Sequence, residues 1–347
     1  MIRWLISGSV ISDLLSGFGV DLGTLKHNTG PDYPKPVPGR ICHIDADFMA
    51  YQVAAESKEE LSGEKPRKSL DDMFHNARVA AEHVMRLAGA TSYVCHTTPS
   101  GSTKGGRAEQ AVQKEYQANR KGREKPEFLD TVRAFIGREL NGIPHMDQEA
   151  DDGLAQAAYN DTNACICSKD KDLRMVPGLH LDMYTGEMVR VDPTSFGHIE
   201  LTAKGKLVGY GPKFFFAQCL MGDPADNIAG APGIPGRVRA EVSPTAAYIK
   251  AVEKGSDKQI DAELAKTIKC GPSTAFKVLD HTTSIREAFA LVKRCFTELA
   301  EHHGHEFKHW KTGAVVSPTQ ALLGDMQCLW MRRNKNPMDV VEWLKTS

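Results

Sequence analysis

The chain has 347 residues, of which 41% are hydrophobic, so it can bury the core of one large α/β domain or of two smaller ones. Its 43 basic and 44 acidic residues give a formal net charge of -1, which excludes a globally basic or acidic protein. The eight cysteines form no CxxC pair, and this favours reduced thiols in a cytosolic protein over a disulfide scaffold.

Residues 1–39 are predicted to be an N-terminal extension and linker. Residues 2–25 are fairly apolar, but Asp13 interrupts them, so a packing helix is favoured over a secretory signal. Four prolines between Asn28 and Arg40 then predict the linker. No later run approaches the ~20 apolar residues that span a bilayer, so we expect no membrane partner.

Residues 40–212 are predicted to form an α/β core. Short apolar runs predict strands at 41–44, 91–95 and 164–167, and helical spacing predicts helices at 70–88, 128–140 and 150–159. Residues 183–189 resemble a hairpin. Sites in parallel sheets form beyond the carboxyl ends of the strands. A helical region is expected to follow over residues 213–347.

Acidic residues follow these segments in four places. They are Asp45 with Asp47, Glu149 with Asp151 and Asp152, Asp170 with Asp172, and Asp223 with Asp226. Carboxylates brought together by a fold repel one another unless cations are present, so the set suggests a divalent metal site. Ligands that are all oxygen favour Mg²⁺ or Mn²⁺ over zinc.

Each acidic cluster also has an ordinary structural interpretation. Asp45 suits the N-cap of a helix beginning near Phe48, and acidic first turns such as 149–152 are common. Solvated turns account for 170–172, and an Asp-Pro turn accounts for 223–226. These alternatives stay open at the level of sequence.

Residues 104–125 carry the clearest basic excess in this half of the chain. Seven basic residues minus three acidic ones give +4, and Tyr116 lies among them as a stacking group. A solvated, flexible segment is the alternative. Because the segment lies just before the acidic clusters that begin at Glu149, we favour a nucleic-acid contact.

Two glycine-rich stretches follow a helix predicted at 214–221. Residues 228–236 form a turn, and Gly271 starts a helix whose open amides suit a phosphate. Such a contact positions a nucleic-acid backbone without reading bases. The histidines between His302 and His309 favour a polar surface over a metal site, since no cysteine pattern accompanies them.

The ordered set of motifs resembles the phage and bacterial 5′ nucleases of the flap endonuclease family, which include 5′→3′ exonucleases. The matching segments are Ile44–Asp47, Tyr116–Arg120, Glu149–Asp152, Asp170–Asp172, Met221–Asn227, the turn at 230–236 and the helix start at Gly271. The resemblance covers residues 40 to 280.

The resemblance implies a parallel-sheet core flanked by helices (5′ nuclease or PIN-like), a helical arch or gateway over residues 104–125, and a helix-three-turn-helix DNA-binding element. It assigns a first metal to Asp45, Glu149, Asp151 and Asp152, and a second to Asp170, Asp172, Asp223 and Asp226. Two or more Mg²⁺ ions, replaceable by Mn²⁺, would activate water and stabilise charge on the phosphate. The implied gateway residues are Tyr116, Arg120 and Lys121, with Arg120 steering the scissile phosphate. The implied DNA contacts are Gly233, Gly236, Gly271, Ser273, Thr274 and Lys277.

The function implied by the resemblance is a metal-dependent 5′→3′ exonuclease or 5′ flap nuclease. It would hydrolyse phosphodiesters in DNA and in RNA primers, with duplex or flapped DNA and RNA–DNA hybrids as partners. As a phage protein of DNA replication it would act in the host cytoplasm. The sequence carries no signal for oligomeric state.

Two departures from the family pattern favour an alternative. Thr97-Thr98 stand where the family has an aspartate, and Gln117 stands where it has a lysine; Asp47, Lys114 or Lys121 are candidates to compensate. The departures favour a structure-specific DNA-binding protein with little catalysis, whereas the retained carboxylates argue against it. A metal-dependent RNase is a third reading. Residues 237–270 also separate the two halves of the DNA-binding turn.

Overall fold

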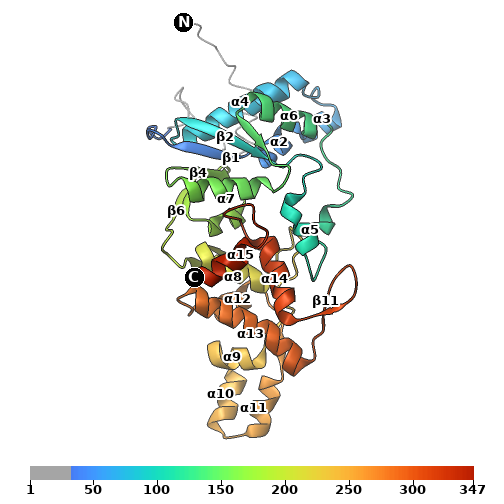
Figure 1. The fold of residues 1–347 in the computed structure, drawn as a ribbon, viewed down its shortest axis with the longest axis vertical. Helices are drawn as coiled ribbons and strands as arrows, with labels where there is room; N and C mark the ends of the chain where they lie inside the picture. The colour runs from blue at the N-terminus through green and yellow to red at the C-terminus, as the bar shows by residue number, and fades with distance from the viewer. Residues whose placement is uncertain (1–32) are drawn as a thin grey trace. The chain divides into compact units, whose positions relative to one another are not determined.

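The computed structural model describes residues 33–347, which divide into two compact units (Figure 1). The first unit comprises residues 33–105, 124–173 and 177–190, and the second comprises 106–123, 174–176 and 191–347. The apolar stretch at 2–25 lies outside the described residues. Residues 106–123 and 191–212 belong to the second unit. The predicted domain border at residue 212 stays a prediction.

The first unit is built on a six-stranded sheet with the order β3-β2-β1-β4-β5-β6. β1 is parallel to β2 and to β4, and parallel pairs also join β2 to β3 and β4 to β5. The predicted parallel-sheet core flanked by helices is therefore confirmed. The strands are β1 (Ile41–Asp45), β2 (Ser92–Thr97), β3 (Gly142–Pro144), β4 (Cys165–Ser168), β5 (Gly178–Asp182) and β6 (Met188–Val191).

Helices cover both faces of this sheet (Figure 1). α2 (Ala46–Ala54), α4 (Leu70–Leu87) and α6 (Leu129–Glu139) pack on one face, and α7 (Ala150–Asn160) packs on the other. Strand alternation decides which side chain meets which layer. Cys42 and Ile44 join the apolar core shared with α2, α4 and α6. His43 and Asp45 alternate with them and therefore face α7. A short helix, α3 (Lys58–Ser62), follows α2.

Local sequence signals set the limits of these helices. α4 begins after Ser69, whose hydroxyl accepts from Asp72 N while the Asp72 carboxylate accepts from Ser69 N. This capping box satisfies two amides that the helix itself cannot pair. Alanines along the buried side of α4 let the helix lie close to the sheet; they are Ala77, Ala80 and Ala81.

The second unit is mainly helical, and α8 (Gly211–Met221) is its centre. Phe214, Phe215 and Phe216 are all buried on α8, which packs against α12, α13 and α14. The tail after α14 adds Trp330 and Trp343, whose rings stack at 4.5 Å and pack on Phe215. The other helices are α5 (Arg107–Gln110), α9 (Gly236–Val242), α10 (Ala246–Glu253), α11 (Asp257–Leu264), α12 (Pro272–Leu279), α13 (Ile285–His303), α14 (Pro318–Leu329) and α15 (Asp339–Thr346).

Short strand pairs complete this unit. β7 (His198–Leu201) pairs with β8 (Leu207–Tyr210), and β11 (Phe307–Lys308) pairs with β12 (Val315–Val316). Between Lys104 and Arg120 the basic segment forms two 3-10 turns, η2 (Lys104–Gly106) and η3 (Ala118–Arg120), and the four-residue α5. The gateway segment implied by the resemblance therefore contains only these short helical turns.

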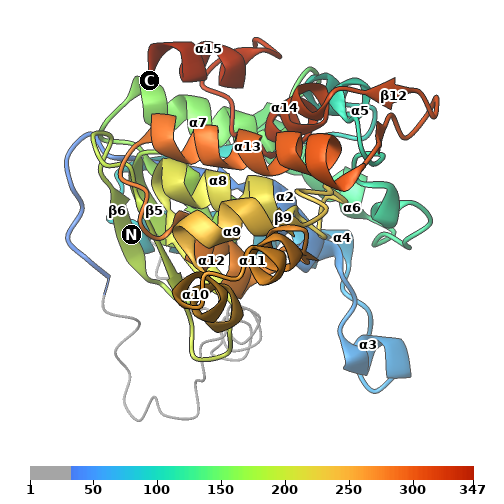
Figure 2. The same ribbon diagram turned by 90° about the horizontal axis from the view of Figure 1, so that it is seen from below.

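The insertion at 237–270 has its two ends close together in the fold. β9 (Ile234–Pro235) pairs antiparallel with β10 (Thr267–Ile268), and α9, α10 and α11 lie between them (Figure 2). A Cβ on Gly236 would stand 2.4 Å from the Glu263 carbonyl oxygen, so only glycine fits this crossing. The two halves of the glycine-rich element are thus adjacent in the fold. Within residues 33–347, no helix is long and apolar enough to cross a membrane.

Candidate active site

The carboxyl ends of β1 and β4 hold the first of the predicted carboxylates. Asp45 ends β1 and is 8% exposed. Its Oδ2 accepts from Ser168 Oγ at the end of β4 (2.7 Å), and its Oδ1 accepts from Phe48 N (3.3 Å). The N-cap interpretation of Asp45 is therefore confirmed, because this side chain caps α2. Ser168 is a contributor that the sequence did not single out.

The start of α7 supplies the next carboxylates. Glu149 is the N-cap residue, and the fully buried Asp152 completes a capping box by accepting from Glu149 N (3.4 Å). Asp151 lies in the first helical turn, where the open amides and the helix dipole favour negative charge. The acidic first turn thus also has the structural role that sequence alone left open.

Burial and mutual repulsion perturb the carboxylates at this sheet edge. Burial raises the pKa of Asp45 to about 6, with further contributions from the charges of Asp47 and Asp170, while its hydrogen bonds act in the opposite direction. Burial, followed by the charges of Asp45 and Asp170, raises the pKa of Asp151 well above its usual value. Glu149 and Asp47 add to the same effect. Five carboxylates from β1, α2, α7 and the turn after β4 therefore form one acidic group.

The donor set of this acidic group fits a hard divalent cation. Carboxylate oxygens are the ligands that Mg²⁺ and Mn²⁺ prefer, and a cation would relieve the repulsion that raises these pKa values. Within residues 33–347, no three or more His, Cys, Asp or Glu side chains are arranged to hold a metal as they stand. Mg²⁺ usually keeps several waters and takes one or two carboxylates directly. The chemistry of the residues therefore fits the ion without a preformed protein cage.

Asp47 is tied to protein donors. Its Oδ2 accepts from Thr98 N (2.9 Å), and its Oδ1 lies 2.9 Å from Arg133 Nε in an ion pair whose alignment does not make a hydrogen bond. The Thr98 hydroxyl in turn accepts from Ala150 N (2.9 Å). Thr98, found where the family pattern has an aspartate, thus links the start of α2 to the start of α7.

The turn after β4 is organised by its own side chains. Asp170 N donates to Ser168 Oγ (2.9 Å), and Asp172 N donates to Asp170 Oδ1 (2.8 Å). Asp172 is buried and pairs with Lys171 Nζ at 2.9 Å. Asp170 contributes to the acidic group, whereas Asp172 has a lysine partner of its own.

Lys169 lies in the same turn and was not predicted as a functional residue. Its Nζ is 5.0 Å from the centre of the Phe48 ring and 4.4 Å from that of Tyr184. Cations over aromatic faces are attracted by the ring electrons. Nothing in the spacing of these three residues along the sequence indicates that they meet.

Three histidines cross the strands under α7. His43 is hydrogen-bonded to His96 (3.0 Å), which is hydrogen-bonded to His145 (2.9 Å). Burial lowers the pKa of His96 to about 3, and both neighbouring histidines add to this effect. Gly153 of α7 lies directly over the rings, since a Cβ there would stand 2.3 Å from His145 Nε2. Sequence reasoning missed this row, because its members lie far apart along the chain.

Within the second unit, the motif at 115–120 docks on the turn at 223–227. Gln117 N donates to Asp226 O (2.8 Å), and Gln117 Nε2 donates to Asp226 Oδ1 (3.0 Å). Tyr116, which is buried, donates to Asp226 Oδ2 (3.3 Å), and Arg120 forms an ion pair with the same carboxylate. Asn227 Nδ2 returns a bond to Glu115 O (2.8 Å). Two motifs that were separate in the sequence are thus halves of one contact.

The other predicted residues of this unit have local partners. Asp223 is buried, and its Oδ1 accepts from Ala225 N (2.7 Å), as the Asp-Pro turn interpretation expected. Lys121 pairs with Glu115 at 2.6 Å. A Cβ on Gly233 would stand 2.4 Å from Thr267 Cγ2. Gly271 is the N-cap of α12, and Ser273 and Lys277 are exposed on that helix beside the partly exposed Thr274.

No protein-family model matches the chain, and no curated protein matches it. Among solved structures, the chain is similar to the bacteriophage T5 5′-exonuclease with bound zinc ions, at 15% identity and a TM-score of 0.42, over 76% of this chain and 98% of that one. A bacteriophage T5 flap endonuclease complex with DNA and metal ions gives 15% identity and a TM-score of 0.41, over 75% and 92%. A T5 protein co-crystallised with metal ions gives 17% identity and a TM-score of 0.39, over the same shares. The similarity is to 5′ nucleases.

The site residues divide between the two units. In the first unit the structure gathers Asp45, Asp47, Glu149, Asp151 and Asp170. In the second it joins Tyr116 and Arg120 to Asp226. A second metal held by Asp170, Asp172, Asp223 and Asp226 stays a prediction, since these residues belong to different units. The DNA contacts at 233–236 and 271–277 also stay predictions.

Proposed function

We propose that this protein is a divalent-metal-dependent 5′ nuclease that hydrolyses phosphodiesters. The observation that carries the proposal is the acidic group in the first unit, in which burial and neighbouring charges raise the pKa values of Asp45 and Asp151. Structural proteins seldom retain several buried carboxylates that destabilise one another, whereas metal sites require them. The order of the motifs along the chain supports the assignment to 5′ nucleases.

The residues of the first unit would divide the work of holding the cation. Asp45, Glu149, Asp151 and Asp170 would supply oxygen ligands, and Ser168 would orient Asp45 through its 2.7 Å hydrogen bond. Asp152, fully buried in the capping box, would keep Glu149 in place. When bound, a divalent cation supplies activation of the attacking water and neutralisation of charge on the phosphate.

The second unit would contribute the phosphate contacts. Arg120 is half-exposed and would exchange its Asp226 partner for a phosphate oxygen, which a guanidinium binds in the same geometry as a carboxylate. Tyr116 and Lys121 would act beside it. The exposed first turn of α12 would contact the backbone of duplex DNA.

The finer assignments belong to the same proposal. We assign Mg²⁺ as the ion, replaceable by Mn²⁺, and 5′→3′ polarity on duplex or flapped DNA. RNA primers in RNA–DNA hybrids are included as substrates. A role in phage DNA replication in the host cytoplasm is part of the same proposal.

A structure-specific DNA-binding protein with weak catalysis is the second candidate. Two observations favour it. Arg133 forms an ion pair with Asp47, and the side-chain amide of Gln117, which stands where the family pattern has a lysine, donates to Asp226. Neither Asp47 nor Gln117 would then be available to assist at the transition state.

The test is cleavage of a 5′-flapped duplex labelled at each end in turn, in Mg²⁺ and in EDTA, by the wild type and by Asp45→Asn. Asparagine caps a helix as well as aspartate does, so the variant keeps the bond to Phe48 N. It loses the charge, and its amide nitrogen replaces the oxygen that accepts from Ser168 Oγ. Asp182→Asn is the matched control, because Asp182 ends β5 and its side chain accepts from Tyr184 N in a local turn.

We expect metal-dependent release from the 5′ side by the wild type and by Asp182→Asn, and at least about a hundredfold slower release by Asp45→Asn. Tight duplex binding without cleavage in either Mg²⁺ or Mn²⁺ would instead support the DNA-binding protein.

A further inference from the structure

The first part of the basic segment is fastened to α14 and to the residues after it. Arg107 is 1% exposed; its Nε donates to Cys328 O (3.2 Å) and its Nη2 donates to Trp330 O (3.0 Å). These carbonyls lie at the C-terminal end of α14, where the helix leaves its acceptors unpaired and favours a cation. A buried guanidinium therefore fixes the start of the segment.

The next residues of the segment are held through their backbone. Trp310 N donates to Val112 O (2.8 Å), and Trp310 Nε1 donates to Ala111 O (3.1 Å). Gly324 of α14 lies against Val112 so closely that a Cβ would stand 2.6 Å from Val112 Cγ2. Residues 107–112 thus have little freedom to move away from α14.

A buried carboxylate on α14 connects the basic segment to the residues after the turn at 223–227. Asp325 is 4% exposed, and its Oδ2 accepts from Gln113 Nε2 (2.6 Å) and from Gly230 N (2.8 Å). Gln113 Nε2 also approaches Gly230 O at 3.2 Å. Burial raises the pKa of Asp325 to about 7, so the fold tolerates a costly group here. An apolar residue would pack at this position at less cost, which points to a role in joining the two segments.

The two segments joined by Asp325 are those that carry the predicted substrate contacts. Gln113 precedes the motif at 115–120, and Gly230 follows the turn at 223–227, which that motif contacts. Asp325 therefore holds the first segment just before the motif at 115–120 and the second segment just after the turn at 223–227.

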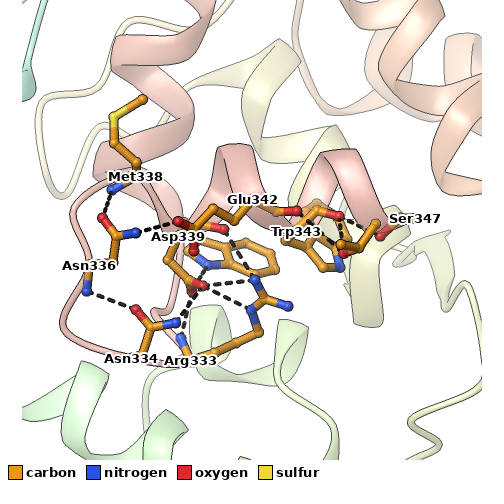
Figure 3. A network of polar contacts seen from close by, with 10 residues as sticks. Arg333, Asn334, Asn336, Met338, Asp339, Glu342, Trp343 and Ser347 are labelled. Carbon is orange, nitrogen blue, oxygen red and sulfur yellow. Dashed lines mark hydrogen bonds and ion pairs between the residues drawn. The ribbon is translucent and has the colours of Figure 1, made fainter.

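The tail that accepts Arg107 is itself anchored. Asp339 is fully buried; its Oδ2 accepts from Trp330 Nε1 (2.7 Å) and from Arg333 N (2.7 Å), and its Oδ1 accepts from Arg333 Nε (3.0 Å) (Figure 3). This network holds residues 330–334, from which Arg332 Nη2 reaches Gln110 Oε1 (3.1 Å). Residues 330–332 of the C-terminal region thus also contact the basic segment.

We propose that Asp325 is a positioning residue that holds the gateway motif 115–120 against the turn at 223–227. Residues 310–334 assist by holding residues 107–112, which precede the motif. The consequence for substrate rests on the proposed nuclease function. Asp325 acts through Gln113 and Gly230 on the placement of Tyr116 and Arg120.

Two variants at Asp325 separate positioning from packing. In Asp325→Asn, the amide oxygen can take the place of Oδ2 and accept both bonds, so the contact is kept. In Asp325→Leu, a side chain of similar size accepts neither. Gln113→Ala removes one donor at a partly exposed position and remains informative if the leucine variant fails to fold. Glu298→Leu is the control, because Glu298 is a buried carboxylate of α13 that pairs with Arg294.

The first readout is trypsin cleavage after Arg120, Lys121 and Arg123 in the absence of DNA and metal. We expect cleavage to be about tenfold faster or more in Asp325→Leu and in Gln113→Ala, and within about twofold of wild type in Asp325→Asn and Glu298→Leu. The second readout is the split between kcat and KM on a 5′-flapped duplex, together with Mn²⁺ binding. We expect a lower kcat/KM with unchanged Mn²⁺ binding in the two disrupting variants, and rescue in Asp325→Asn.

The two proposals fail in different ways. Unchanged trypsin cleavage in Asp325→Leu and Gln113→Ala would overturn the positioning role, whatever the activity of the wild type. Faster cleavage of these variants in a protein that never cuts the flapped duplex would support the positioning role and overturn the nuclease.

Discussion

The second unit should lose stability as the pH rises, because Asp325 must ionise inside the fold. Its pKa in the folded protein is raised to about 7, against an ordinary value of 3.8 for the unfolded chain. Between these values the folded state binds more protons than the unfolded state, so the free energy of unfolding falls by about 1.4 kcal/mol per pH unit. From pH 5 to pH 8 the loss comes to about 2.5 kcal/mol, and above pH 8 it levels off.

Asp325→Asn isolates this contribution, since the amide keeps both hydrogen bonds and does not titrate. The assay is urea unfolding of wild type and variant at pH 5 and pH 8, followed by tryptophan fluorescence. Trp310, Trp330 and Trp343 all belong to the second unit and report on it. We expect the stability of Asp325→Asn relative to wild type to increase by about 2.5 kcal/mol between the two pH values. A difference that is the same at both pH values would refute the reasoning.

Three further predictions concern other buried groups. Arg107→Met should destabilise the second unit by about 3 kcal/mol or more in urea unfolding, because the Cys328 and Trp330 carbonyls lose their donor, and a loss below about 1 kcal/mol would contradict the anchoring role. Gly153→Ala should lower the melting temperature through overlap with His145 at a cost of about 1–3 kcal/mol, whereas Gly137→Ala, with open space around its Cβ inside α6, should raise it. Acid should destabilise the first unit between pH 6.5 and pH 3, because His96 binds its proton more readily in the unfolded chain. His96→Gln should flatten the dependence of the free energy of unfolding on pH in this range, followed by circular dichroism. An unchanged slope would count against the buried neutral histidine.

Hydrophobic periodicity was sufficient to predict the main elements of the first unit. The runs ending at Ile44 and Cys167 became β1 and β4, and the pattern from Leu70 became α4. Asp45 shows the limit of such reasoning, because cap and site interpretations were weighed as alternatives and the same side chain caps α2 while facing the acidic group.

Contacts between distant parts of the sequence could not be predicted. Gln113 and Asp325 are 212 residues apart, and neither belongs to a motif. The hydroxyl of Thr98 accepts from Ala150 N only because the end of β2 lies beside the start of α7. The charges of the basic segment are visible in the sequence and suggested a nucleic-acid contact or a flexible surface segment. The donors that hold its backbone, such as Trp310, gave no such signal.

The pairing of β9 with β10 brings the two ends of residues 237–266 together, and Glu241 of α9 also pairs with Arg294 of α13. α10 and α11 meet at Gly255, which is exposed and has a positive φ of 61°. A reporter domain inserted there would extend from a hairpin whose two ends are already joined, in the unit that does not contain Asp45 or Asp151. The connection between α10 and α11 could be lengthened or exchanged in the same way, while Gly236 at the base keeps the close approach to the Glu263 carbonyl oxygen.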